Sequence, residues 1–250
     1  SNQYTFTFGA GAVLNDVVSY YIVAQDLSAV QSVTCYPLEG ASGFTVDPPA
    51  VSTPPTSPSS YTIIKSLSGV ILVGEGQTFT SLSQTGGLFD AINQGIITGN
   101  ITVKITSDII ETGQVSLNRQ LEEALYTLTI QPDAAVLRTI YGSVNQGMIR
   151  LYGARNVTID GRFEGSGNYL DFYNYRYFSN GIAVQIISEG TGLGCNNITI
   201  RNCTIRTGTM GNSGGTPVYS YALQIGGVSS NSSGADNDNI SIIDNLFTNA

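Results

Sequence analysis

The chain has 250 residues and contains no His, which excludes Ser-His-Asp triads, Cys-His dyads and histidine metal sites within these residues. Charged residues make up 11% of the chain, against roughly 25% in typical soluble domains, and the formal net charge is −8. Nucleic acids and anionic membranes are bound through basic patches, so this charge argues against both as partners. No apolar run reaches the roughly 18–20 residues of a membrane span, so none is expected.

The first 46 residues favour β-structure. Residues 3–8 and 17–26 cluster or alternate β-branched and aromatic side chains, as strands do. We interpret 1–46 as strands resembling the end of a β-sandwich, either a partial module or strands that dock on the region after the linker, because a complete sandwich needs roughly 100 residues. Residues 47–60 hold five of the eight prolines and are predicted to form an extended linker.

Residues 61–250 are predicted to form a second, unlike region. Short strands at 61–65 and 70–73 precede one helix at about 87–96, where apolar residues recur at helical spacing between glycines. From Ile101 onward, brief strands alternate with Gly, Asn and Asp.

These brief strands repeat along the chain. The segments RNVTIDGRF, NNITIRNCTI and DNISIIDNLF place Asn156, Asn197 and Asn239 at matching positions, 41 and 42 residues apart. Each segment follows another apolar strand, and two upstream segments, 101–108 and 126–133, resemble earlier and shorter turns of the same winding. Repeats of roughly 20–50 residues without intervening helices indicate a solenoid.

Alternation within the repeats indicates which side chains are buried. In NITI, Ile198 and Ile200 point to one face and Thr199 to the other, and NISI after Asp238 repeats the arrangement. Parallel strands in identical register would stack the isoleucines into ladders. Asn202 and Asp244 suit the bends because their side chains tolerate left-handed backbone. The repeat therefore predicts an all-β parallel β-helix.

The three cysteines do not form a disulfide framework. Cys195 and Cys203 flank a predicted strand, and about 3.3 Å per residue would separate them by roughly 26 Å. We expect no bridge between them, and Cys203 to be a small buried hydrophobe.

The combination resembles the pectin-lyase-like right-handed parallel β-helix superfamily. More narrowly, GGLFDAINQGIITGNITVKITSD, YTLTIQPD and NVTIDGR resemble large secreted surface proteins of the Bacteroidetes, which combine sandwich modules, β-helices and a C-terminal sorting domain. The resemblance implies a right-handed winding, an N-terminal cap formed by the helix at about 87–96, and a secreted or cell-surface location. Activity does not follow, because the superfamily includes hydrolases, lyases, adhesins and tailspikes.

Comparison with the polygalacturonases of that superfamily argues against their reaction. Those enzymes place one catalytic Asp before a Gly-Ile strand and a pair after a Thr-Gly, where this chain has Asn180, then Thr209 and Met210. If an insertion follows Gly208, the residues before the next strand are Ser220 and Tyr221. Inverting hydrolysis needs two carboxyl groups, so no catalytic residue is assigned.

A polysaccharide lyase is an alternative, because β-elimination can use Arg or Lys as base with Ca²⁺ neutralising a uronate carboxylate. Outward positions on the repeats supply Arg150, Arg162, Arg201 and Asp160. The plainer interpretation is solvated ion pairs. We expect no cofactor and no metal site; Asp236 and Asp238 are the one candidate pair for Ca²⁺, in a loop that is equally typical of turns.

Residues 161–180 form the segment most typical of ligand binding. This predicted excursion carries six aromatic residues within ten positions, and aromatic faces stack on sugars while Asp and Arg bind hydroxyls. The alternative is that it folds back over the solenoid flank. With two arginines from the repeats, the candidate ligand-binding residues are Tyr169, Asp171, Tyr173, Tyr175, Arg176, Tyr177, Arg150 and Arg201.

The sequence therefore favours a secreted bacterial cell-surface protein, non-catalytic, that binds a polysaccharide or surface glycan and belongs to a larger multi-module chain. One alternative is a lyase or glycoside hydrolase acting on uronic-acid polymers with its active groups on later coils, and another is a structural stalk. The last repeat ends without a cap, so we expect further coils or an end-to-end contact.

Overall fold

The computed structural model describes residues 5, 9–29, 33–37, 56–119, 126–177, 180–208, 211–213, 216–218, 220–227 and 235–249. The chain divides into two compact units, Ser1–Lys65 and Ser66–Ala250. We call the second the parallel-sheet unit, because its long sheets consist of parallel strands.

Among its described residues, the first unit contains two short antiparallel pairs. Strand β1 (Val17–Tyr20) pairs with β4 (Ser59–Thr62), and β2 (Ile22–Gln25) pairs with β3 (Val33–Tyr36). The end of the predicted linker is therefore strand, while 47–55 and most of the strand expected at 3–8 lie outside the described residues. The β-sandwich interpretation of 1–46 stays a prediction.

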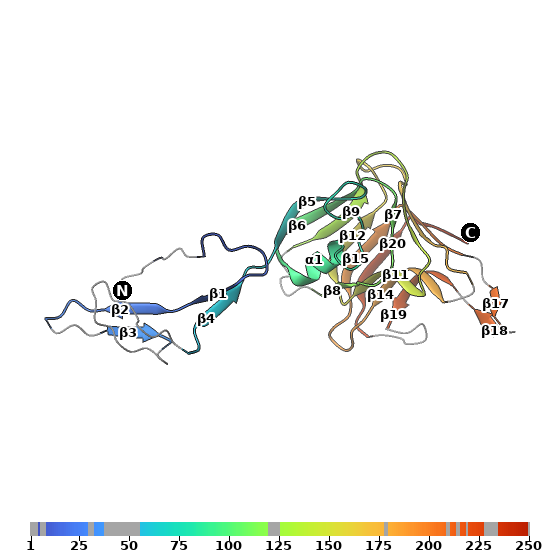
Figure 1. The fold of residues 1–250 in the computed structure, drawn as a ribbon. Helices are drawn as coiled ribbons and strands as arrows, with labels where there is room; N and C mark the ends of the chain where they lie inside the picture. The colour runs from blue at the N-terminus through green and yellow to red at the C-terminus, as the bar shows by residue number, and fades with distance from the viewer. Residues whose placement is uncertain are drawn as a thin grey trace. The chain divides into compact units, whose positions relative to one another are not determined.

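The parallel-sheet unit contains three parallel sheets whose strands stack along one direction (Figure 1). The long sheet has the order β20 (Asp238–Ile243), β15 (Asn196–Arg201), β12 (Arg155–Asp160), β9 (Leu128–Pro132), β6 (Ile96–Ile105), β5 (Ser66–Val73). The middle sheet has the order β21 (Leu246–Asn249), β16 (Cys203–Thr207), β13 (Leu170–Asn174), β10 (Arg138–Gly142), β7 (Ile109–Ile110). The short sheet has the order β19 (Tyr221–Gly226), β14 (Gly181–Ile187), β11 (Gln146–Tyr152), β8 (Leu117–Asn118).

The chain visits the three sheets in a fixed order. One circuit takes a strand from the long, then the middle, then the short sheet, as in β9–β10–β11 and β12–β13–β14. In the fourth circuit, a two-stranded antiparallel hairpin, β17 (Gly211–Ser213) with β18 (Thr216–Val218), lies between β16 and β19. This mostly stranded, parallel arrangement is consistent with the predicted all-β solenoid.

In-register pairing builds the predicted apolar ladders. Ile200 pairs with Ile159 on one side and Ile242 on the other, and Ile159 also pairs with Ile130. Ile130, Ile159 and Ile200 are fully buried, and burying one such side chain stabilises the fold by roughly 1.5–3 kcal/mol. Thr199 points the other way and is half-buried, as the alternation predicts.

Asparagine occupies a special backbone conformation at the start of each repeat. Asn156, Asn197 and Asn239 have φ of 54°, 57° and 53°, in the left-handed region that Asn tolerates better than most residues. The Asn197 side chain donates to Asn156 Oδ1 at 2.8 Å, which links two circuits. The bends at Asn202 and Asp244 are also left-handed, with φ of 50° and 51°, as predicted.

The predicted helix is α1 (Leu88–Gln94), somewhat shorter than the expected 87–96. Its buried residues Leu88, Phe89 and Ile92 join the core, and the helix contacts β8, the terminal strand of the short sheet. Asn93 holds this contact, because its Oδ1 accepts a hydrogen bond from the backbone N–H of Asn118 in β8 at 3.0 Å.

A buried carboxylate ties the turn before α1 to the first circuit. Glu111, which follows β7 and is 1% exposed, accepts hydrogen bonds from the backbone N–H groups of Leu82 at 2.6 Å and Ser83 at 2.7 Å. The hydroxyls of Ser81 and Ser83 donate to the same carboxylate at 2.8 and 2.6 Å. Burial raises the pKa of Glu111, and these four hydrogen bonds only partly oppose that rise.

Glu111 makes the stability of the parallel-sheet unit depend on pH. A folded-state pKa above the ordinary value of 4.5 means that its contribution is fully present below about pH 4.5 and is lost as pH rises through the folded pKa. Relative to Glu111→Gln, which does not titrate, the parent should therefore lose unfolding free energy over the pH range above about 4.5. Urea unfolding across that range measures the difference, with exposed Glu164→Gln as the control; a difference independent of pH would contradict the assignment.

Candidate functional site

The outward side chains of the middle sheet form a continuous row across its strands. Pairing places Tyr141 beside Tyr173, and Tyr173 beside Arg206, on neighbouring strands about 4.8 Å apart. Their neighbours in sequence, Ile140, Phe172 and Ile205, point inward and are fully buried. We call this surface the outer row; it consists of Ile110, Tyr141, Tyr173, Arg206 and Thr248.

An ion pair fixes the arginine of this row. Arg206 Nη2 lies 2.6 Å from Asp171 Oδ2, and Arg206 Nε donates to both carboxylate oxygens at 3.0 and 3.1 Å. The guanidinium carbon lies 4.1 Å from the centroid of the Tyr173 ring, a cation–π distance. The hydrogen bonds with Asp171 raise the pKa of Arg206, and Asp171 itself is only 3% exposed.

Tyr175 stands beside the outer row, and Tyr177 follows it in the same turn. The Tyr175 ring lies 5.8 Å from that of Tyr173 and 6.5 Å from that of Tyr141, tilted against both. Tyr175 is 44% exposed and Tyr177 is 55% exposed, so these two rings offer the open aromatic surface. Tyr173 is only half-buried, but Arg206 already occupies one of its faces.

Asn174 positions the turn that carries these tyrosines. Its fully buried side chain accepts from the backbone N–H of Val144 at 3.0 Å and donates to the carbonyls of Val144 and Ile182 at 2.9 and 3.0 Å. Its Oδ1 also accepts from Arg176 N at 3.3 Å, and Tyr175 N donates to the Gly142 carbonyl at 2.9 Å. The backbone after β13 is therefore anchored on both sides.

The expectation that 161–180 is one excursion is wrong. Leu170–Asn174 is β13, an ordinary member of the middle sheet, and Phe172 within it belongs to the core. The loop before β13 folds back over earlier circuits, because Lys104 Nζ of β6 lies 5.8 Å from the Phe163 ring centroid. Tyr169 is half-buried in this loop, and Phe178 lies outside the described residues.

The structure does not bring Arg150 and Arg201 to the outer row. Arg201 lies on the long sheet, 2.7 Å from Asp160, which also pairs with Arg162 at 2.9 Å. Burial acts to raise the pKa of Asp160, but hydrogen bonds from both arginines outweigh it and lower that pKa. Arg150 lies on the short sheet, and its Nη2 donates to the Gly113 carbonyl at 2.7 Å.

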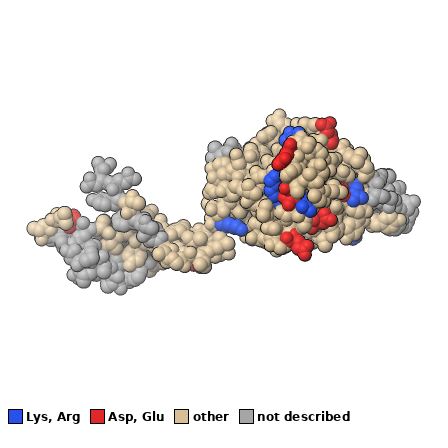
Figure 2. Space-filling view, turned by 90° about the horizontal axis from the view of Figure 1, so that it is seen from above, with Lys and Arg blue, Asp and Glu red and all other residues tan. Residues whose placement is uncertain are grey.

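The predicted lyase residues are consequently split between two sheets. Asp160, Arg162 and Arg201 meet at one corner of the long sheet. Arg150 lies instead on the short sheet, where burial lowers its pKa. Opposite charges lie side by side over one part of the surface in Figure 2, as such ion pairs require, and most of the remaining visible surface carries neither sign.

The loop at 235–238 uses its oxygens to hold the backbone. Asp236 accepts from the backbone N–H of Gly192, and Asn237 Oδ1 accepts from that of Cys195 at 3.0 Å. Within the described ranges, no group of three or more Asp, Glu or Cys side chains is placed to hold a metal ion. Calcium binding by Asp236 and Asp238 stays a prediction.

The cysteines are packing residues. Cys195 and Cys203 are both free and fully buried, which confirms the prediction of a buried Cys203. Burial raises their pKa values to about 11 and about 12, so both remain protonated thiols at neutral pH. Neither is poised as a nucleophile.

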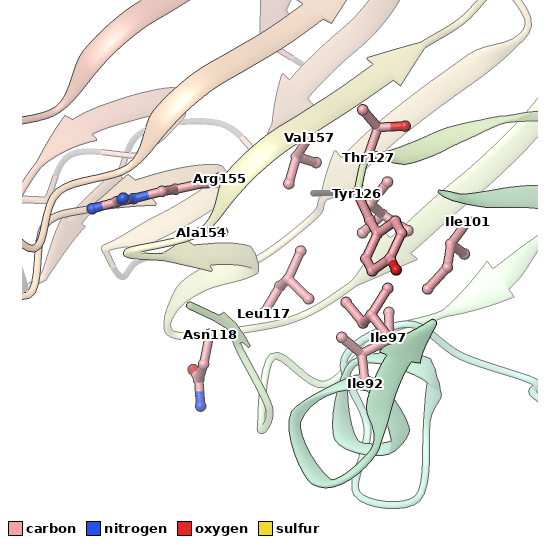
Figure 3. Close-up of a pocket in the computed structure, with 11 residues that line it drawn as sticks. Ile92, Ile97, Ile101, Leu117, Asn118, Tyr126, Thr127, Ala154, Arg155 and Val157 are labelled. Carbon is pink, nitrogen blue, oxygen red and sulfur yellow. The ribbon is translucent and has the colours of Figure 1, made fainter. Parts of the chain in front are cut away.

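A small cavity of about 30 Å³ lies beside α1 (Figure 3). Its lining is mostly aliphatic, with Ile92, Ile97 and Leu117 among the contributors, and the polar ends of Asn118 and Arg155 point away from it. Pockets for small-molecule ligands usually measure about 300–1,000 Å³, so this cavity is a packing gap in the core.

Sequence reasoning missed Tyr141 and Arg206. The signal that finds them is the second strand of each circuit, where RTIYG, LDFYN and CTIRT align with Tyr141, Tyr173 and Arg206 at the same outward position. Of the polygalacturonase positions, Asn180 is described and its carbonyl accepts from Gln146 N at 3.0 Å, whereas Thr209 and Met210 lie outside the described residues.

Comparison with protein-family models, curated proteins and solved structures gives no match for this chain. The resemblance to the pectin-lyase-like superfamily and to Bacteroidetes surface proteins therefore stays a prediction from the motifs. Across the described residues, none of the helical structure is long and apolar enough to cross a membrane.

The Asp171–Arg206 pair should matter more for stability than a more exposed pair. Asp171→Ala leaves Arg206 without its carboxylate, and we expect a loss of about 1–3 kcal/mol, discounted because the Arg206 side chain is 32% exposed. The matched control is Asp133→Ala, whose side chain is 29% exposed and pairs with Arg138 at 2.8 Å, with an expected loss below about 1 kcal/mol. Urea unfolding measures both, and equal losses would contradict this ranking.

Proposed function

We propose that the parallel-sheet unit is a right-handed parallel β-helix whose first circuit is capped by α1. The recurring path through the long, middle and short sheets supports the helical winding. The contact of α1 with the terminal strand β8, and its buried Leu88, Phe89 and Ile92, support the cap.

On this unit, the outer row with Tyr175 and Tyr177 binds glycans without catalysing a reaction. The observation that carries this proposal is the tyrosine cluster beside the Asp171–Arg206 pair, on adjacent strands of the middle sheet. Tyrosine presents an apolar ring face to the C–H groups of a sugar and a hydroxyl to its oxygens. Arg206 adds N–H donors at a fixed position.

The direction of the row suits a chain-like ligand. Because the row crosses the strands, each circuit adds one outward side chain to it, from Ile110 through Tyr141, Tyr173 and Arg206 to Thr248. A polysaccharide laid along this line meets a new side chain roughly every 4.8 Å. A repeating ligand therefore matches a repeating surface.

The resemblance to Bacteroidetes surface proteins supports a secreted or cell-surface location, with the glycan-binding unit as one module of a larger chain. The net charge of −8 and the 11% of charged residues are compatible with a surface that binds through hydroxyl and ring contacts. No polyphosphate partner is needed for this role.

Replacing the two open rings should weaken glycan binding. We expect Tyr175→Ala with Tyr177→Ala to reduce affinity roughly tenfold, the effect of losing two ring contacts, without lowering the melting temperature. Affinity electrophoresis in gels containing xylan, glucomannan, mixed-linkage β-glucan, dextran, alginate or polygalacturonate measures retention of the parent and the variant.

The matched control is Tyr221→Ala, an exposed tyrosine of the short sheet. Retention of the parent on none of the six polysaccharides would overturn the proposal. An equal loss of retention in Tyr221→Ala would also overturn it, because the effect would then not belong to the outer row.

A further inference from the structure

The charges around the outer row are balanced or negative. Arg206 is paired with Asp171, and Arg138 at the start of β10 is paired with Asp133. Asp108, whose Oδ1 accepts from the backbone N–H of Thr139 at 2.7 Å, adds one negative charge beside the row.

Arg176 lies in the turn that follows β13. A Cβ on Gly181, the first residue of β14, would lie 3.1 Å from the Arg176 Cβ, so the Arg176 side chain starts against the short sheet. Tyr175 and Tyr177 on either side of it are the exposed members of that turn.

An anionic ligand would have to compete for Arg206. Two guanidinium nitrogens, Nε and Nη2, already face Asp171 at 2.6–3.1 Å. A ligand carboxylate that took this arginine would leave Asp171, which is 3% exposed, as a buried charge without its partner. A sugar hydroxyl needs only one donor or acceptor, and the guanidinium has five N–H groups, so an uncharged ligand leaves the pair intact.

We propose that the outer row selects uncharged glycans and discriminates against polyanionic ones, with the Asp171–Arg206 pair as the specificity determinant. This inference rests on the glycan-binding function proposed above. The pair holds the arginine for hydroxyl contacts while cancelling its attraction for carboxylates and sulfates, and the net charge of −8 repels them further.

The test compares polysaccharides that share a backbone and differ in charge. Suitable pairs are hydroxyethyl cellulose with carboxymethyl cellulose, dextran with dextran sulfate, and fully methyl-esterified with de-esterified homogalacturonan. At low salt, we expect the parent to bind the uncharged member about fivefold or more tightly in every pair that it recognises, and added NaCl to narrow this gap by screening.

Asp171→Asn provides the second arm of the test. It removes the countercharge of Arg206 at nearly constant side-chain volume, so the affinity for the charged member should rise about fivefold relative to the uncharged member. The matched control Asp160→Asn, at the ion pairs of the long sheet, should leave the ratio unchanged. Melting temperatures identify a variant that fails to fold. If Asp171→Asn does not fold, the effect of salt on the parent's preference for the uncharged members tests the proposal instead.

The outcomes distinguish the selectivity inference from the glycan-binding function on which it rests. If the parent binds uncharged and charged members equally, or prefers the charged ones, the selectivity inference is overturned and glycan binding stands. If neither member of any pair is retained, and none of the six polysaccharides is either, glycan binding itself fails.

Discussion

The structure depends on one constraint, which is that strands of successive circuits pair parallel and in register. Under that constraint, side chains at matching positions of successive circuits lie over one another, as Ile130, Ile159, Ile200 and Ile242 do in one unbroken ladder. The same rule acts on the outward side, where it aligns Tyr141, Tyr173 and Arg206. The ladders fill the core, and the alternate side chains of the same strands face outward.

Register also explains how the few charges are used. Asp160 and Asp171 both point outward from their strands, yet they are 6% and 3% exposed, because arginines from the neighbouring circuit lie over them. Each pair crosses from β12 to β15 or from β13 to β16, so it joins circuits by side chains as the backbone ladder joins them by hydrogen bonds. In these two pairs, charge therefore serves to stack one circuit on the next.

The sequence predicted the long sheet well, because its repeats share the pattern of left-handed Asn and alternating Ile around Asn156, Asn197 and Asn239. The middle sheet was harder. Its outward residues Tyr141, Tyr173 and Arg206 recur at 32 and 33 residues rather than the 41 and 42 of the long-sheet asparagines. Strand β13 was hidden further because Asp171 and Asn174 are polar yet buried, which breaks the apolar pattern of a core strand. Composition also does not reveal which of the three sheets a strand joins. Arg150 and Arg201 were therefore grouped with tyrosines that lie on another sheet.

Hydroxyl-radical footprinting of the tyrosines tests the location of the binding surface most directly. The chain is labelled with and without a polysaccharide that retains it, and the oxidation rate of each exposed tyrosine is read by mass spectrometry. The account predicts that Tyr175 and Tyr177 react more slowly when the polysaccharide is present, while Tyr221 on the short sheet is unaffected. Protection of Tyr221 with unchanged labelling of Tyr175 and Tyr177 would contradict it.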